Sequence, residues 1–252
     1  MEVRKDITYA SHAGERGRLD LLFPDQASDC PLVMVIHGGG LQALSKERMT
    51  GVSTSIVEQG WVAVNINYRL LPDHPFPAQL EDVLTAYRWI KTTDQQDICR
   101  QDRTRIALLG ASAGAFLAMA AGLILGREQV KSIVSISGPS GRRRSSDSHT
   151  SEVSDPRMLS APIELVTSES PPLLATHSRN DQLVKPENSV AIVEKMQEAS
   201  CKAELYLYNG PGTLHGIWRN DKPPLRFFQH LENAIATFLR KYFTTALPRK
   251  LN

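Results

Sequence analysis

The sequence predicts an α/β fold in which helices cover both faces of a mostly parallel β-sheet. From residue 31 onward, short apolar runs alternate with segments of helical periodicity. The runs at 31–36 and 61–66 are almost continuously apolar, as expected of parallel strands that are buried on both faces. The chain has 252 residues, of which 41% are hydrophobic and 22% charged, and this suits one domain with a sizeable core. We therefore expect residues 1–252 to form a single domain.

The N-terminal elements are predicted from strand and turn signals. Residues 6–10 and 19–23 have strand character and flank a turn with two glycines, so we expect an antiparallel pair at the edge of the sheet. A helix is predicted at 47–59, where Gly60 provides the C-terminal cap. The later predictions are strands at 105–109, 130–137, 171–176 and 203–208, helices at 78–92, 113–125, 187–199 and 225–243, a short helix at 155–159 and a polar connection at 94–103.

Composition and targeting signals narrow the class of protein. The formal net charge is +2, so the totals do not point to nucleic acid or to an acidic surface as partner. The three cysteines are widely spaced and form no C-x-x-C motif, as expected of reduced thiols in a cytosolic protein. The N-terminus lacks the apolar segment of a secretory signal, and the apolar stretch at 113–125 is too short to span a bilayer. We expect a cytoplasmic protein that binds neither nucleic acid nor membrane.

The pentapeptide Gly110-Ala111-Ser112-Ala113-Gly114 has the pattern G-x-S-x-G. It follows the apolar run 105–109 and precedes a run of good helix formers, so its serine stands at a turn between a strand and a helix. Such a nucleophile elbow needs small flanking residues, because the chain passes close to the neighbouring strand and helix. A small-residue turn used only for packing is the alternative on the pentapeptide alone. We predict that Ser112 is a nucleophile.

A histidine must accept the proton of such a serine, and a carboxylate must orient that histidine. In folds of this kind the order along the chain is serine, acid, histidine. Of the seven histidines, His215 follows the last predicted strand, which is where the base is expected. The competitors lie in polar loops, in a proline-rich loop, at a strand end or within the last helix: His12, His149, His74, His177 and His230.

The acid is expected after the strand that precedes the last one. Asp181 follows the predicted strand 171–176 by a few residues and is therefore the predicted acid. An ordinary turn aspartate is the alternative interpretation. Asp155 and Asp221 are rivals, but neither directly follows an apolar strand.

Acyl transfer also needs hydrogen-bond donors for the oxyanion that forms on the substrate. The segment His37-Gly38-Gly39-Gly40 directly follows the predicted strand 31–36. Its glycines leave backbone amides uncovered and let the chain approach a substrate closely. A phosphate-binding loop is the alternative, but neither G-x-G-x-x-G nor G-x-x-x-x-G-K-[ST] follows this strand.

Taken together, these segments resemble the α/β-hydrolase superfamily, and within it the small carboxylesterases related to hormone-sensitive lipase and the bacterial feruloyl esterases. The resemblance covers nearly the whole chain and rests on His37–Gly40, Tyr68-Arg69-Leu70, Phe76-Pro77-Ala78, Gly110–Gly114, Asp181 and His215-Gly216. It implies a Ser112–Asp181–His215 triad and an oxyanion hole formed by the amides of Gly39, Gly40 and Ala113. The chain departs from the family pattern at Leu41, Ala111 and Ala115.

The triad and the resemblance together imply a serine hydrolase that cleaves small carboxylic esters through an acyl-enzyme intermediate. They imply no metal ion and no organic cofactor. Arylformamidase, peptidase and thioesterase activities use the same triad and stay open. A non-catalytic small-molecule-binding protein on this fold is a further alternative.

Residues 138–170 interrupt the alternation of strands and helices with a polar segment. We expect this segment to lie over the site as a small lid. Its run Arg142-Arg143-Arg144 is either a solvated stretch or a contact for an acidic substrate. The oligomeric state is not determined by the sequence, and a homodimer formed through an exposed sheet edge stays open.

Overall fold

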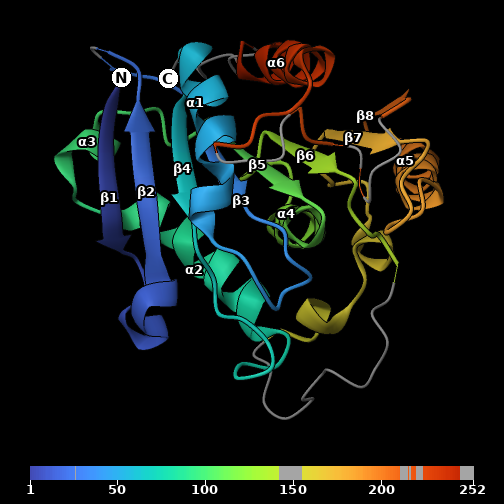
Figure 1. Ribbon diagram of the computed structural model, residues 1–252, viewed down its shortest axis with the longest axis horizontal. Coiled ribbons are helices and arrows are strands. Elements are labelled where there is room, and N and C mark those ends of the chain that lie inside the picture. Colours follow the sequence, from blue (N-terminus) through green and yellow to red (C-terminus); the bar gives the residue numbers. More distant parts are fainter. Residues whose placement is uncertain (26, 142–154, 211–214, 216, 220–223, 245–252) are drawn as a thin grey trace, which may run out of the picture.

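The chain folds around one eight-stranded β-sheet, shown in the computed structural model of Figure 1. The structure describes all residues except 26, 142–154, 211–214, 216, 220–223 and 245–252. The strands are β1 (Glu2–Thr8), β2 (Arg18–Phe23), β3 (Leu32–Ile36), β4 (Val62–Ile66), β5 (Ile106–Ala111), β6 (Ser132–Ile136), β7 (Leu173–Ser178) and β8 (Ala203–Tyr208). Their order across the sheet is β1-β2-β4-β3-β5-β6-β7-β8.

Most neighbouring strands in this sheet are parallel. β2 runs antiparallel to both β1 and β4, and every later pairing from β4–β3 to β7–β8 is parallel. The central strand β3 pairs with β4 on one side and β5 on the other, so that Leu32 lies opposite both Val62 and Ile106. These pairings confirm the predicted mostly parallel sheet and the predicted antiparallel pair at its edge.

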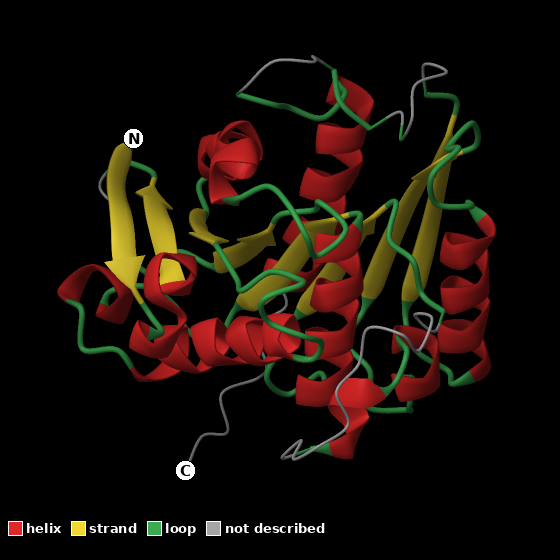
Figure 2. Ribbon diagram, turned by 60° about the horizontal axis from the view of Figure 1, so that its bottom comes forward, coloured by secondary structure: helices red, strands yellow, loops and turns green. Residues whose placement is uncertain are grey.

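Helices cover both faces of the sheet (Figures 1 and 2). The α-helices are α1 (Thr50–Glu58), α2 (Ala78–Thr92), α3 (Gln96–Cys99), α4 (Ala113–Leu125), α5 (Glu187–Glu198) and α6 (Gln229–Phe243). Side chains of α2, α4 and α5 belong to one hydrophobic core, whereas those of α1 and α6 belong to a second core on the opposite face. The sheet is therefore the middle layer of three.

The alternation of side chains along β3 explains its continuously apolar sequence. Leu32, Met34 and Ile36 enter the core that α2 and α4 cover, and Val33 and Val35 enter the core that α1 and α6 cover. All five side chains are fully buried. Successive side chains in a strand point to opposite faces of the sheet. Because β3 lies between two helical layers, it buries every side chain and is apolar at every position.

The helix α4 follows Ser112 and is buried on all sides from Ala113 to Leu123. It packs against β5 and β6, against α2, and against the 3₁₀ turns Pro156–Leu159 and Pro162–Leu165. A Cβ added at Gly122 would come within 2.5 Å of Ile133 Cδ1, so this glycine permits the close approach of α4 to β6. Burial on every side explains why this segment has no polar stripe.

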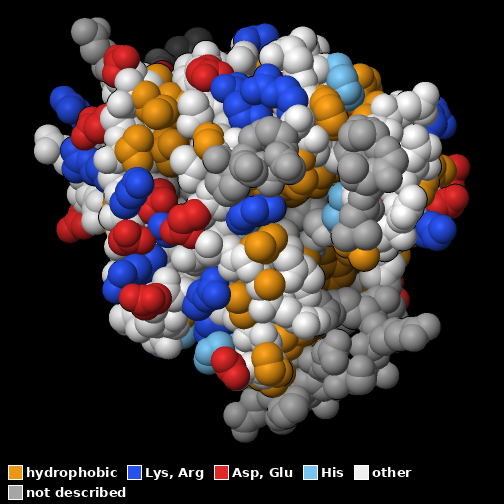
Figure 3. All heavy atoms as spheres, in the orientation of Figure 1, with side chains coloured by type: hydrophobic (Ala, Val, Ile, Leu, Met, Phe, Trp, Pro, Cys, Tyr) orange, Lys and Arg blue, Asp and Glu red, His pale blue; other side chains and the backbone are white. Residues whose placement is uncertain are grey.

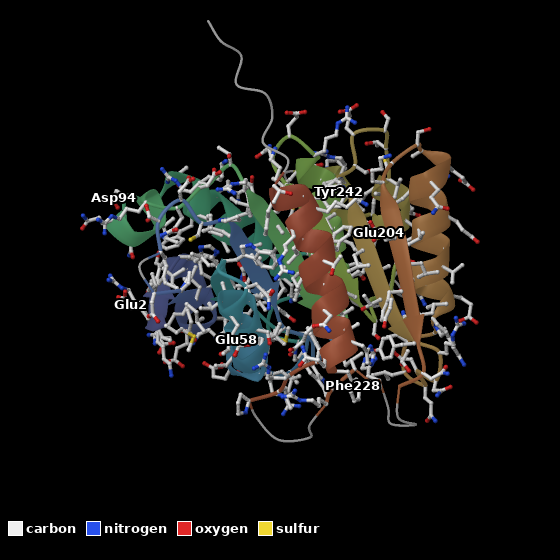
Figure 4. All side chains as sticks on the ribbon, turned by 90° about the horizontal axis from the view of Figure 1, so that it is seen from above. Glu2, Glu58, Asp94, Glu204, Phe228 and Tyr242 are labelled. Carbon is white, nitrogen blue, oxygen red and sulfur yellow. The ribbon has the colours of Figure 1, made fainter. Side chains whose placement is uncertain are left out.

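The last helix is shorter than predicted. It was expected at 225–243, but α6 begins at Gln229 because the residues before it are extended. Phe227 forms an isolated β-bridge with Trp218, and their rings stack with centroids 5.1 Å apart. This tertiary contact overrides the helical pattern of 225–228. In Figure 4, Phe228 and Tyr242 mark the two ends of α6, and Lys241 of this helix pairs with Glu204 of β8 at 2.8 Å.

Other element boundaries differ in smaller ways. The predicted helix 78–92 matches α2, and the predicted short helix near 155–159 is the 3₁₀ turn Pro156–Leu159. The predicted helix 47–59 begins as the 3₁₀ turn Lys46–Met49 before α1, and the connection 94–103 contains the short helix α3. A further 3₁₀ turn, Pro162–Leu165, was not predicted. Residues 142–154 of the expected lid 138–170 lie outside the described residues, so the lid and the single domain stay predictions.

Within the described part of the chain, no helix combines the length and the apolar character needed to cross a membrane. The same part contains no cluster of three or more His, Cys, Asp or Glu side chains with the geometry of a metal site.

Candidate active site

The candidate catalytic residues all lie just beyond the carboxyl ends of strands, and these strand ends lie on the same side of the sheet. Ser112 follows β5, Asp181 lies shortly after β7, and His215 lies in the segment after β8. The glycine loop, residues 37–40, follows β3. In parallel sheets the carboxyl ends of all strands lie on one side of the sheet, and ligands bind there.

The backbone of Ser112 is in an unusual conformation. Its φ of 56° and ψ of −122° lie outside the regions that L-residues commonly adopt, and such a residue costs on the order of 1–3 kcal/mol. Its N–H donates to Ile136 O of β6 at 2.8 Å, and its carbonyl accepts from Ala115 N–H of α4 at 2.9 Å. Strand, turn and helix therefore hold this conformation together, as expected of a nucleophile elbow.

The glycines of the elbow are required by close backbone contacts. A Cβ on Gly114 would lie 2.2 Å from Ile36 O and 2.4 Å from His37 O. A Cβ on Gly110 would lie 2.1 Å from Gly114 O. The elbow therefore packs directly on the end of β3, where the glycine loop begins.

Three side chains form a continuous hydrogen-bonded series. Ser112 Oγ lies 3.0 Å from His215 Nε2, and His215 Nδ1 lies 2.7 Å from Asp181 Oδ2. The carboxylate can only accept, so Nδ1 carries the proton and Nε2 is free to accept the serine hydroxyl proton. The structure thus brings together the nucleophile, base and acid predicted from the sequence, in the geometry that a serine hydrolase needs.

Backbone amides fix the orientation of the Asp181 carboxylate. The N–H groups of Leu183 and Val184 both donate to Asp181 Oδ1 at 2.9 Å, while Oδ2 faces His215. The Asp181 side chain is fully buried, whereas that of His215 is 14% exposed. A buried carboxylate with these donors presents one oxygen to the imidazole in a defined direction.

A second histidine, His177, also lies beside the same carboxylate. Its Nε2 is 3.2 Å from Asp181 Oδ2 and donates to Val184 O at 2.9 Å, so that Nδ1 accepts from the Ser189 hydroxyl at 2.7 Å. Burial lowers the pKa of His177 below its ordinary value, and the ring is neutral at pH 7. The sequence suggested His177 as a competitor for the base, but its ring nitrogens are occupied by these contacts.

The glycine loop approaches the nucleophile closely. A Cβ on Gly38 would lie 2.9 Å from Ala111 O and 3.2 Å from Ser112 Cβ. Gly39 and Gly40 have φ values of 105° and 65°, which favour glycine, and Gly39 O accepts from the amides of Gln42 and Ala43. Among the described residues, the amides of Gly39 and Gly40 donate to no backbone acceptor. They are therefore available to a ligand beside Ser112.

The side chains of His37 and Tyr68 contact this loop and hold it in place. Their rings stack with centroids 4.1 Å apart, and the Tyr68 hydroxyl donates to His37 O at 2.8 Å. His37 Nδ1–H donates to Gly38 O at 2.7 Å. Burial lowers the pKa of His37 to about 4, so its imidazole is neutral and serves the loop rather than proton transfer.

A cavity of about 400 Å³ opens beside the nucleophile. Ser112 and His215 lie on its wall together with glycines of the loop. The remaining lining side chains are mostly apolar, with one arginine: Leu44, Arg48, Met49, Ala111, Leu183, Ile217 and Trp218. A cavity of this size and character suits a small, largely apolar molecule.

The rival residues suggested by the sequence have other surroundings. His12 lies 3.7 Å from Asp82, and His230 stacks against Phe228. Asp155 pairs with Arg157 at 2.7 Å. His74 is exposed, and none of these four residues lines the cavity. The rivals His149 and Asp221 and the run Arg142-Arg143-Arg144 lie outside the described residues.

The sheet order, the elbow and the loops beyond β3, β7 and β8 define an α/β-hydrolase. The sequence model of the BD-FAE family matches residues 19–149, which is more than half of the chain. The chain therefore belongs to the BD-FAE family.

Known esterases are similar to this chain. Esterase LipC of Mycobacterium tuberculosis is 28% identical over 219 residues, a match that covers 73% of this chain and 53% of LipC. The chain spans about half the length of LipC and of LipM, a probable carboxylic ester hydrolase of the same organism. An esterase of Pyrobaculum calidifontis has a similar structure, with a TM-score of 0.74 and 25% identity over 95% of this chain and 85% of that one. Esterase 2 of Thermogutta terrifontis, solved phosphoramylated by tabun, has a TM-score of 0.78 at 20% identity, with 97% of each chain covered.

Proposed function

We propose that this protein is a serine carboxylesterase that hydrolyses small carboxylic esters. The observation that carries the proposal is the continuous series from Ser112 through His215 to Asp181 at the wall of a cavity. The relatives LipC and LipM and the Pyrobaculum protein bear the names of esterases or ester hydrolases, which favours an ester over other acyl compounds.

The reaction proceeds in two halves. Ser112 Oγ attacks the acyl carbon of the ester while His215 Nε2 takes the hydroxyl proton. The tetrahedral intermediate collapses, the alcohol leaves with the proton from His215, and the acyl group stays on Ser112. Water then attacks this acyl-enzyme with His215 again as base, releasing the acid and restoring the serine. Throughout, Asp181 holds the imidazole in the Nδ1–H tautomer and stabilises its protonated form.

The oxyanion that forms in each half is assigned to three backbone amides, those of Gly39, Gly40 and Ala113. The lack of backbone acceptors for the first two among the described residues supports this, as does the contact of the loop with the elbow. Ala113 is the first residue of α4, and the positive end of that helix dipole favours negative charge at this position.

The finer predictions made from the sequence belong to the same proposal. They are a cytoplasmic location, a lid at residues 138–170, and a protein that needs no cofactor and binds neither nucleic acid nor membrane. A homodimer stays open. Arylformamidase, peptidase or thioesterase activity and a non-catalytic binding protein are the outcomes against which the proposal is tested.

The direct test is hydrolysis of p-nitrophenyl esters from acetate to decanoate. We expect turnover that falls with acyl length, because the cavity is small, and that drops by several orders of magnitude in Ser112→Ala. Ser53→Ala is the matched control, since Ser53 is a buried serine on α1 whose hydroxyl finds no hydrogen-bond partner in the described part of the chain.

The outcomes separate the alternatives. Labelling of Ser112 by a fluorophosphonate without ester turnover would favour a formamidase, peptidase or thioesterase. Absence of both labelling and turnover in a folded protein would contradict the proposal and favour a binding protein. Equal loss of activity in the Ser53 control would show that the serine dependence is not specific.

A further inference from the structure

Arg48 lies on the wall of the cavity that contains Ser112 and His215. It belongs to the 3₁₀ turn that connects the glycine loop to α1. Its neighbours Lys46 and Met49 are each 1% exposed, so the turn is anchored on both sides of Arg48. An arginine is thus built into the wall of the reaction cavity by the backbone that follows the glycine loop.

The other cation of this turn is fully paired. Lys46 Nζ lies 2.9 Å from Asp6, 2.8 Å from Asp20 and 2.9 Å from Glu47. Its side chain is 2% exposed, so these three carboxylates replace the water that a free ammonium would bind. The acid next to Arg48 in the sequence, Glu47, is thereby engaged with Lys46.

Arg48 lacks such compensation. Its Nε is shut off from solvent and has no hydrogen-bond partner among the described residues, and no ion pair found among them includes Arg48. A guanidinium stays charged at any pH that proteins tolerate, so the cavity always holds this positive charge. A guanidinium charge without a carboxylate partner attracts an anion that enters the cavity.

Several other arginines have carboxylate partners. Arg69 pairs with the buried Asp82 at 2.8 Å, and Arg226 pairs with Glu58 at 2.7 Å. On the face shown in Figure 3, basic side chains on the left lie among acidic ones. Arg48 differs from Arg69 and Arg226 in two ways: it lines the cavity, and it has no carboxylate partner among the described residues.

The other described residues of the cavity wall supply no negative charge. Among the described lining residues, Arg48 is the one side chain with a permanent charge, and no carboxylate is present. Most of the other side chains are apolar, including Leu44, Leu183 and Trp218. The described part of the wall thus combines a largely apolar surface, the nucleophile and one fixed cation.

We propose that Arg48 makes this site selective for esters that carry a free carboxylate in addition to the scissile bond. The inference rests on the proposed esterase function and names its substrate class. The carboxylate of the substrate pairs with the Arg48 guanidinium while its apolar part contacts the rest of the wall. Hydrolysis breaks the ester C–O bond and adds water across it, and the carboxylate held by Arg48 is unchanged by the reaction.

Two matched substrate pairs test the proposal. The first places the carboxylate on the acyl side, as monomethyl adipate against methyl hexanoate. The second places it on the alcohol side, as 4-acetoxybutyrate against butyl acetate. For each pair the readout is the ratio of kcat/KM for the charged ester to kcat/KM for the neutral one, measured by alcohol release or by acid production at constant pH.

We expect this ratio to exceed one in the wild type by about tenfold to a hundredfold in at least one pair, the size of a charged hydrogen bond. Arg48→Met should bring the ratio to about one or below, and Arg48→Lys should keep part of it, because Lys retains the charge without the planar fork. Arg88→Met is the matched control. Arg88 is exposed on α2 and bonds Thr85, so this variant removes one positive charge away from the cavity and should keep the wild-type ratio.

The possible results separate the two proposals. A wild-type ratio near or below one in both pairs, or an unchanged ratio in Arg48→Met, would overturn the role of Arg48 while neutral-ester turnover keeps the esterase function intact. If neither ester of a pair is hydrolysed, calorimetric titration of Ser112→Ala with monomethyl adipate and with methyl hexanoate decides the question without turnover. Tighter binding of monomethyl adipate that is lost when Arg48→Met is added supports the anion site even though the esterase function has failed, and equal binding of the two esters overturns the anion site as well.

Discussion

The two sides of the candidate site are built in different ways. On the nucleophile side, Ser112 is placed by backbone packing, since Gly114 lets the elbow touch the end of β3 and Gly110 lets the strand approach Gly114, with no room for a Cβ at either glycine. On the acid–base side, Asp181 and His215 lie in loops beyond β7 and β8, and hydrogen bonds orient them. The position of the nucleophile thus depends on close backbone packing, whereas the positions of the acid and the base depend on hydrogen bonds.

This difference predicts two kinds of failure. Changes to the glycines on the nucleophile side should cost folding, because backbone atoms of central strands cannot move apart without disturbing both cores. Changes on the acid–base side should cost activity while the fold persists, because the affected groups end in loops. Variants that violate this division would show that the two sides are coupled.

The largest expected effect is on the acid–base side, at Asp181. Asp181→Asn should lower kcat/KM for a neutral ester by about 10⁴-fold, because an amide can donate to Nδ1 and favour the wrong imidazole tautomer. The midpoint of urea unfolding should change little, since Asn keeps an oxygen that accepts from Leu183 N–H. Loss of folding together with activity would show that this carboxylate is a structural requirement instead.

On the nucleophile side, Gly114→Ala should destabilise the protein by more than about 3 kcal/mol, because its Cβ would lie 2.2 Å from Ile36 O. Chemical denaturation measures the loss. Gly141→Ala is the control, since a Cβ there meets no atom of the described residues within 4 Å. A Gly114→Ala protein as stable as the wild type would mean that β3 and the elbow are not packed as tightly as described.

Lowering the pH should reduce the free energy of unfolding, because it favours protonation of His37, whose neutral ring stabilises the glycine loop. Its folded pKa is about 4 because burial disfavours the charged ring, whereas an unfolded histidine has a pKa near 6.5. The unfolded state therefore binds the proton first, so stability is fully present above about pH 6.5 and is lost as the pH falls toward 4. The loss amounts to about 3 kcal/mol over this window.

Two measurements check this assignment. The free energy of unfolding, followed from pH 7 to pH 4, should fall, and NMR titration should show a His37 ring that stays neutral down to about pH 5. A ring that titrates near pH 6.5 would contradict the assignment, whatever the stability curve shows.

The smallest expected effect concerns His177, a positioning residue on the acid–base side. His177→Phe removes the donor that lies 3.2 Å from Asp181 Oδ2 and should lower kcat by about tenfold, with a shift in the acidic limb of the pH–rate profile. His177→Gln, which retains a donor, should recover part of the loss. A drop in kcat with an unchanged pH profile would indicate a purely structural role.

The sequence predicted the nucleophile side most completely. The pattern G-x-S-x-G needs small residues for local steric reasons, and those reasons are visible in the pentapeptide itself. The positions of Asp181 and His215 were also predicted, because strand order determines where the loops emerge. The sheet and most helices follow from apolar patterns of the same local kind.

The features that were missed depend on how the chain turns back on itself and on which residues face the cavity. His177 ends a strand four residues before Asp181, but only the turn between them shows that both lie side by side. The helical pattern at 225–228 gave way to the stacking of Phe227 on Trp218, which lies in a different segment of the chain. Arg48 reads as an ordinary surface residue until the cavity shows which wall it lines. Single-sequence patterns do not contain these pairings.

The central claim, that Ser112 is a nucleophile activated by His215, is tested most directly by covalent trapping. The protein is treated with a fluorophosphonate, and the adduct is counted by intact mass and located by peptide mapping. The account predicts one adduct per chain on Ser112 in the wild type and labelling slowed by orders of magnitude in His215→Ala. An adduct on another residue, or equally fast labelling in His215→Ala, would contradict it.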